Sequence, residues 1–120
     1  MCPTFMAFSE FEKKRAERII GHFIEKRRPP PHIRPKLDLG FRVSGQSIEI
    51  FEIRPAWRNP TVRREHSVAK ATYVKTQGIW RVFWQRANLK WYRYDPVPEV
   101  ESLEQFVSLV AEDEYACFFG

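Results

Sequence analysis

The chain has 120 residues, with 20 Lys and Arg against 15 Asp and Glu, and 43% of its residues are hydrophobic. This length suits one domain with one core, and this composition excludes wholesale disorder. No apolar run approaches the ~20 residues of a membrane-spanning helix, and no signal peptide is visible. Cys2 and Cys117 lie far apart and, with the three histidines, match no zinc spacing. We therefore expect a cytoplasmic protein with free thiols, no metal, no cofactor and no contact with a membrane.

A helix is predicted to begin at Ser9, after a loose extension over residues 1–8. Ser9 and Glu12 fit a capping box, and apolar residues then recur at helical spacing as far as Ile24. The helix must end near Arg28, because the three prolines that follow cannot continue it. Residues 28–37 are expected to form a Pro-rich basic connector.

Residues 39–55, "LGFRVSGQSIEIFEIRP", are typical of a β-hairpin. A turn at Gly45-Gln46 places Arg42 opposite Glu49 and puts the apolar side chains on one face. Glu52 continues that face, so we expect it to be buried and paired with Arg54 or Lys70.

Residues 56–67 are polar and broken by a proline, which indicates a loop. Residues 68–76 fit a strand or a helix, and their Val, Thr and Tyr content favours a strand.

Residues 78–94, "GIWRVFWQRANLKWYRY", hold six aromatic side chains and four Arg or Lys, and no acid. They predict a second hairpin with a two-residue turn at Ala87-Asn88 or Asn88-Leu89. Either turn gives one face that we expect to lie in the core, formed by Trp80, Val82, Trp84, Trp91 and Arg93. The other face is expected to be solvated, and it carries Arg81, Phe83, Gln85, Lys90, Tyr92 and Tyr94.

The chain closes with a helix that is capped by Ser102 and Gln105, and with an apolar tail at Phe118 and Phe119 that we expect to pack on the body. The predicted fold is therefore α+β in one domain over residues 1–120. An N-terminal helix precedes an antiparallel sheet of about four strands, and a C-terminal helix follows. Both helices should cover the tryptophan face.

Charge is distributed unevenly along the chain. The 29 residues between Glu65 and Asp95 contain six bases and no acid, whereas the chain from Asp95 onward contains seven acids and no Lys or Arg. Cations of the acid-free window, with aromatic rings between them, suit phosphates and stacked bases. The candidate nucleic-acid-binding residues are Lys70, Lys75, Arg81, Lys90, Tyr92, Arg93 and Tyr94. The competing expectation is that the acidic segment from Glu99 to Glu114 covers them.

The segments "FEIRP", "AKATYVKTQ", "FWQRANLKWYRY" and "ACFFG" resemble a bacterial family of small proteins, domain-of-unknown-function family 3024. The resemblance covers nearly the whole chain from "MAFSEFEKKR" onward. It implies a cytosolic protein and assigns no activity, cofactor, partner or catalytic residue.

Three functions fit these patterns. The first is a non-enzymatic domain that binds DNA or RNA through a basic, aromatic sheet face. The second is a protein-interaction or homo-oligomeric module, since Trp, Tyr and Arg are also enriched at protein interfaces. The third is a divergent metal-dependent nuclease built on Asp38, Glu52 and Lys70. It conflicts with the hairpin register, which points the two acids to opposite faces.

Overall fold

The computed structural model describes residues 9–113 and residue 118, so the expected extension over residues 1–8, the two cysteines and Phe119 lie outside the described residues. The elements in chain order are α1 (Glu10–Arg27), β1 (Asp38–Ser44), β2 (Ser47–Pro55), β3 (Arg63–Val74), β4 (Ile79–Gln85), β5 (Trp91–Arg93), β6 (Glu99–Val100) and α2 (Leu103–Glu112). None of the helices in this part of the chain is both long enough and apolar enough to cross a membrane.

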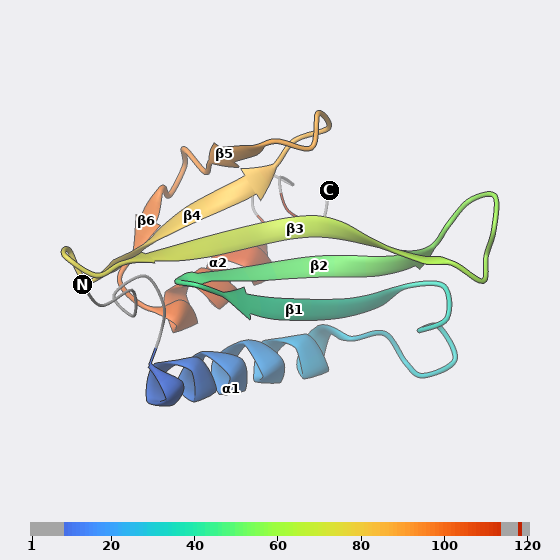
Figure 1. Ribbon diagram of the computed structural model, residues 1–120, viewed down its shortest axis with the longest axis horizontal. Helices are drawn as coiled ribbons and strands as arrows, with labels where there is room; N and C mark the ends of the chain where they lie inside the picture. The colour runs from blue at the N-terminus through green and yellow to red at the C-terminus, as the bar shows by residue number, and fades with distance from the viewer. Residues whose placement is uncertain (1–8, 114–117, 119–120) are drawn as a thin grey trace.

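The strands form one antiparallel sheet in the order β1-β2-β3-β4-β5, and β6 pairs with β4 beyond the end of β5. Figure 1 views the sheet from its open face, with α2 behind it and α1 alongside β1. The predicted α+β fold is confirmed, with six strands in place of about four.

A single hydrophobic core lies between the sheet and the two helices. Fully buried side chains come from every layer, including Ile20 of α1, Ile48 of β2, Val82 of β4 and Phe106 of α2. Trp80 belongs to this core, as predicted, whereas Trp84 is half-buried and packs against its edge. The tryptophan face of β4 is therefore the face that the helices cover.

Local signals set the ends of both helices. The Ser9 hydroxyl accepts from the Glu12 N–H while the Glu12 carboxylate accepts from the Ser9 N–H, which confirms the capping box. In α2 the Ser102 hydroxyl accepts from the Gln105 N–H, but the Gln105 side chain accepts from Glu101 instead of completing the box.

The first hairpin has the predicted register. Gly45 adopts a φ of 59° in the turn, and Arg42 lies opposite Glu49. Glu52 is half-buried and pairs with Arg54 at 3.1 Å, so one of its two expected partners is confirmed. Lys70, the other, lies on the opposite face, because it aligns with Glu49 and not with Glu52.

β3 settles the open assignment of residues 68–76 in favour of a strand and corrects the expected loop. The strand begins at Arg63, so residues 63–67 are paired with β2 and only residues 56–62 form the connection. A register shift opposite Ile50 and Phe51 marks a bulge in this pairing, with Val68 as the extra residue.

The second hairpin forms and β4 has the predicted facing, but the predicted facing of β5 is wrong. Gln85 pairs with Trp91 and the Arg86 N–H donates to Lys90, which leaves three residues in the loop instead of two. One extra loop residue shifts β5 by one position, and a shift of one moves every side chain to the other face. Tyr92 and Tyr94 therefore lie on the core side, while Trp91 and Arg93 lie on the open face.

Candidate nucleic-acid interface

Lys70 lies on the open face, where its side chain is held between rings. Lys70 aligns with Phe83 across β3 and β4, and its ammonium lies 5.0 Å from the Phe83 ring centre and 4.7 Å from that of Trp91. Burial lowers the pKa of the Lys70 ammonium below its usual value, and the nearby Glu49 carboxylate partly offsets this shift. Lys70 is thus partly withdrawn from solvent by the sheet itself.

Arg81 and Arg93 lie on the same open face, and both approach one acid of β6. Glu99 lies 3.5 Å from the Arg93 guanidinium and 4.0 Å from the Arg81 Nε. The competing expectation that the acidic C-terminal segment covers the basic strands is therefore realised for these two arginines.

The remaining candidates from the sequence do not form one patch. Lys75 and Lys90 are exposed, but they flank opposite ends of β4. Tyr92 is half-buried, and its hydroxyl accepts a hydrogen bond from the Asn88 amide. Tyr94 is 1% exposed and packs on Phe118, which confirms the expected docking of Phe118 and removes Tyr94 from any solvated surface.

A second basic surface lies at the far end of the β2–β3 hairpin, and the sequence analysis missed it. Four arginines of this hairpin define it, and we call it the arginine end: Arg54, Arg58, Arg63 and Arg64. Figure 1 shows the β2–β3 connection at the same end of the molecule as the connector between α1 and β1. The two segments touch there, since Arg63 donates to the Arg34 carbonyl oxygen at 3.4 Å.

The arginine end is only weakly neutralised. Arg54 pairs with Glu52, but across residues 9–113 and 118 no acid lies within ion-pair distance of Arg58, Arg63 or Arg64. Arg54 and Arg64 also face each other directly across β2 and β3. Like charges in directly opposed positions destabilise a sheet, and Glu52 offsets the charge of Arg54 alone, so Arg64 is left without an acid of its own in the described part of the chain.

The strands and the loop enclose a cleft of about 450 Å³ at this end, which we call the tip pocket. Its lining is mostly apolar and includes three arginines. The lining residues are Arg54, Pro55, Ala56, Trp57, Arg58, Asn59, Val62, Arg64 and His66. Arginine fits phosphate geometry well because its guanidinium presents a planar fork of donors.

A sequence signal for the arginine end did exist. Residues 53–64 contain four arginines and one tryptophan but no acid. This segment lies outside the acid-free window of the sequence analysis because Glu65 separates the two. In the folded chain, Glu65 pairs with Arg42 on the open face, away from the tip pocket.

The nuclease pattern does not form a shared site. Asp38 is buried, and its carboxylate accepts from Arg28 Nε at 2.7 Å and Arg28 Nη2 at 2.8 Å. Hydrogen bonding to Arg28 holds the pKa of Asp38 at about 2. Asp38 aligns with Ile53 and Glu52 aligns with Leu39, so the two acids point to opposite faces as the sequence predicted. Within the described ranges, no three His, Cys, Asp or Glu side chains group as metal ligands.

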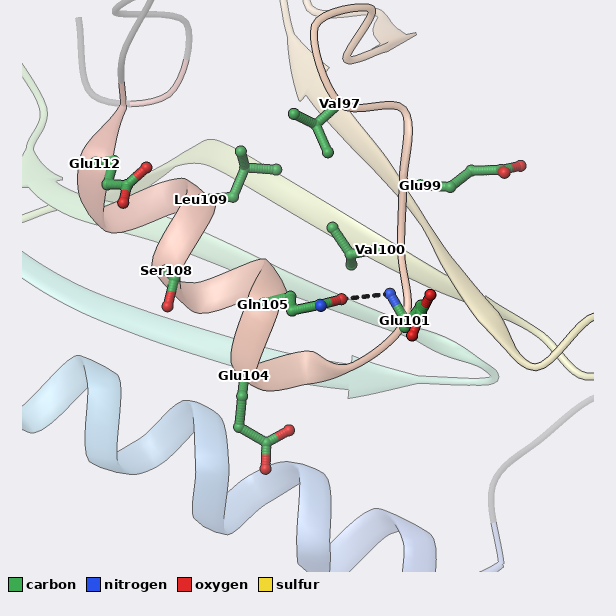
Figure 2. Close-up of a pocket in the computed structure, with 9 residues that line it drawn as sticks. All are labelled: Val97, Glu99, Val100, Glu101, Glu104, Gln105, Ser108, Leu109 and Glu112. Atoms are coloured by element: carbon green, nitrogen blue, oxygen red, sulfur yellow. Dashed lines mark hydrogen bonds between the residues drawn. The ribbon is translucent and has the colours of Figure 1, made fainter.

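An acidic groove lies between α2 and the segment that leads into it. Figure 2 shows its lining, in which Val97, Val100 and Leu109 provide apolar surface. The groove has a volume of about 540 Å³ and is bordered by Glu99, Glu101, Glu104 and Glu112. Its charge is opposite to that of the arginine end.

Comparison with known proteins gives a family and no function. The family model described as a domain of unknown function, DUF3024, matches residues 8–120. No curated protein and no solved structure matches the chain.

Proposed function

Because the chain belongs to the DUF3024 family, a family described only as a domain of unknown function, we propose a function from the geometry. We propose that the protein is a non-enzymatic nucleic-acid-binding domain whose main contact surface is the arginine end. The observation that carries this proposal is that two arginines of the tip pocket, Arg58 and Arg64, have no acid within ion-pair distance among the described residues, and that Arg64 directly opposes Arg54. Phosphate oxygens would relieve this repulsion, and they are the ligands that arginine binds best.

The arginine end supports this function better than the open face of the sheet around β4 and β5, which carries Lys70, Arg81 and Arg93 and which we call the β4–β5 face. On that face Arg81 and Arg93 share Glu99 and Lys70 is held between rings, while Tyr94 is buried on the core side of the sheet. Lys75 and Lys90 remain as exposed cations that could extend the contact. We therefore assign these residues of the sheet a secondary part in binding.

The test is the salt dependence of binding to labelled DNA and RNA oligonucleotides. Wild-type affinity should fall steeply with salt, and the double variant Arg58→Glu, Arg64→Glu should bind weakly, with a salt slope lowered by about one unit for each lost phosphate contact. The matched control is Lys13→Glu, Lys14→Glu on the exposed face of α1, which changes net charge by the same amount. Absence of salt-dependent binding, or equal losses in both variants, would overturn the proposal.

The acidic groove favours a second candidate, a homo-oligomeric module. The groove of one copy and the arginine end of another have opposite charges, and both contain apolar surface. Sedimentation at low and high salt, without nucleic acid, separates the candidates. A salt-sensitive oligomer that is lost in the Arg58→Glu, Arg64→Glu variant supports this module, whereas a monomer at every salt concentration rejects it.

A further inference from the structure

Trp57 projects from an ordered loop into solvent. Its exposure is 89%, the highest among the large hydrophobic side chains in the described part of the chain. Burying such a large apolar ring would stabilise the protein. Trp57 does not stand alone, because Val62 is 45% exposed and lines the same largely apolar cleft, and a contiguous exposed apolar patch of this kind suggests contact with a ligand.

Hydrogen bonds hold the backbone of the loop that carries Trp57. The Ala56 N–H donates to the Val62 carbonyl at 2.7 Å, and the Val62 N–H donates to the Asn59 carbonyl at 2.9 Å. The Asn59 side chain accepts from the Thr61 hydroxyl at 2.6 Å. Ala56 is buried directly before Trp57. The ring is thus presented by a hydrogen-bonded hairpin end, which limits the conformational entropy lost on binding.

The tip pocket places cations beside the exposed ring. Trp57 lines the same cleft as Arg58 and Arg64, and the Arg58 guanidinium lies 5.7 Å from the Trp57 ring centre. An aromatic ring flanked by guanidinium groups is the combination that binds a stacked base and its neighbouring phosphates.

Building on the proposed nucleic-acid function, we propose that the tip pocket binds single-stranded nucleic acid. One unpaired base stacks on Trp57, and the flanking phosphates contact Arg58 and Arg64. A paired base already stacks on its neighbours inside a duplex, so a duplex would offer the arginine end its phosphates alone. Single strands should therefore bind more tightly than duplexes of the same sequence.

The test compares a single strand, its duplex and the same strand with abasic sites, for wild type and Trp57→Ala. Trp57→Ala should weaken single-strand binding about five- to hundredfold, leave the salt slope unchanged and leave duplex binding nearly unchanged. Abasic sites should weaken binding to wild type but have little effect on the variant. Trp57→Phe should restore most of the affinity because it keeps a ring. Tryptophan fluorescence should be quenched by the single strand in wild type and not in Trp57→Ala.

The matched control is Phe11→Ala. Phe11 is 77% exposed at the start of α1, so its removal takes away an exposed aromatic ring elsewhere on the surface. This variant should bind like wild type.

The outcomes separate this inference from the proposed function. Salt-dependent binding that is equal for single strands and duplexes, and unchanged by Trp57→Ala, overturns base stacking and leaves the proposed function standing. A larger loss on duplex than on single strands would make Trp57 a wedge between base pairs and also overturns the inference. No salt-dependent binding to any oligonucleotide overturns both.

Discussion

The Asp38 carboxylate joins the end of α1 to the start of β1. It accepts two hydrogen bonds from Arg28 and one from the Leu39 N–H, and it is 9% exposed. This pair spans the Pro-rich connector, so it fixes where the chain enters the sheet. A buried carboxylate held in this way has a structural role. This role explains why Asp38, a candidate metal ligand in the sequence analysis, is present at this position.

Replacing Asp38 by Asn should make the free energy of unfolding depend less on pH in the acid range. The Asp38 pKa is about 2 in the folded protein, below its ordinary value of 3.8, so the charged carboxylate stabilises the fold above about pH 4. This contribution, about 2 kcal/mol at neutral pH, is lost as pH falls from 3.8 towards 2. Denaturant unfolding of wild type and Asp38→Asn across this range should show a stability gap that closes with acid.

Glu104→Gln is the control for this prediction. Glu104 forms an exposed pair with Arg15, and exposed pairs contribute about 0–1 kcal/mol. The Glu104→Gln variant should therefore track wild type at every pH. A gap between wild type and Asp38→Asn that stays constant down to the lowest pH would contradict the role assigned to Asp38.

At the scale of elements, Gly40 allows β1 and β2 to pack an aromatic ring on the open face. A Cβ at Gly40 would lie 2.7 Å from Phe51 Cε1, closer than real contacts allow. Phe51 is 6% exposed, and the Arg42 guanidinium lies 4.5 Å from its ring centre. The glycine, the ring and the arginine therefore form one packed unit on a face that the helices leave open.

Gly40→Ala should destabilise the protein by about 1–3 kcal/mol, because Phe51 must move off the strand. Gly21→Ala should have the opposite sign. At that position of α1 the nearest atom to a new Cβ is 3.9 Å away, and Ala is favoured over Gly in a helix by about 0.5–1 kcal/mol. Urea unfolding of both variants measures the two effects, and shifts in the same direction would refute this packing account.

Sequence predicts elements well where the signal is local. The capping box at Ser9, the proline stop after Arg28 and the turn at Gly45 each depend on residues within a few positions, and all three appear in the structure. Helix and strand periodicity likewise gave the α+β class and the burial of Trp80.

The facing of β5 depended on a loop conformation that its residues do not signal. Leu89 adopts a φ of 65°, a left-handed conformation that Gly or Asn usually takes. The Asn88 side chain supports the loop by accepting from the Lys90 N–H. A leucine in this position gives no sequence cue for a three-residue loop, so the predicted turn was one residue short and every residue of β5 was assigned to the wrong face.

The sequence analysis did not locate the arginine end for a different reason. Charge was counted along the chain, where Glu65 ends the acid-free window, but an interface depends on charge in space. In the fold, Glu65 and Glu99 neutralise arginines of the open face, whereas Arg58 and Arg64 line one pocket where two strands end. Two of these pairings, Arg42 with Glu65 and Arg81 with Glu99, join residues far apart in the sequence, so no short window contains them.

At the scale of the whole molecule, the two basic surfaces differ in how acids reach them. Glu99 forms ion pairs with both Arg81 and Arg93, so its charge offsets that of the β4–β5 face. Among the described residues, Glu52 is the one acid that pairs with the arginine end, through Arg54. If the arginine end is the binding surface, the protein need not uncover the β4–β5 face in order to bind a polyanion.

Glu99→Gln tests this division of roles, because it frees two arginines without adding a cation. Glu112→Gln is the matched control, since it removes one charge from the acidic groove. If binding is confined to the arginine end, both variants should raise oligonucleotide affinity slightly and equally through the change in net charge, and neither should alter the salt slope.

The combined variant sharpens this test. Glu99→Gln added to Arg58→Glu, Arg64→Glu should not restore binding, because Arg81 and Arg93 are then free but the arginine end is lost. A salt slope that is steeper for Glu99→Gln than for Glu112→Gln, by about one unit for each freed arginine, would instead show that these arginines contact phosphates. With restored affinity in the combined variant, that result would move the nucleic-acid surface to the β4–β5 face.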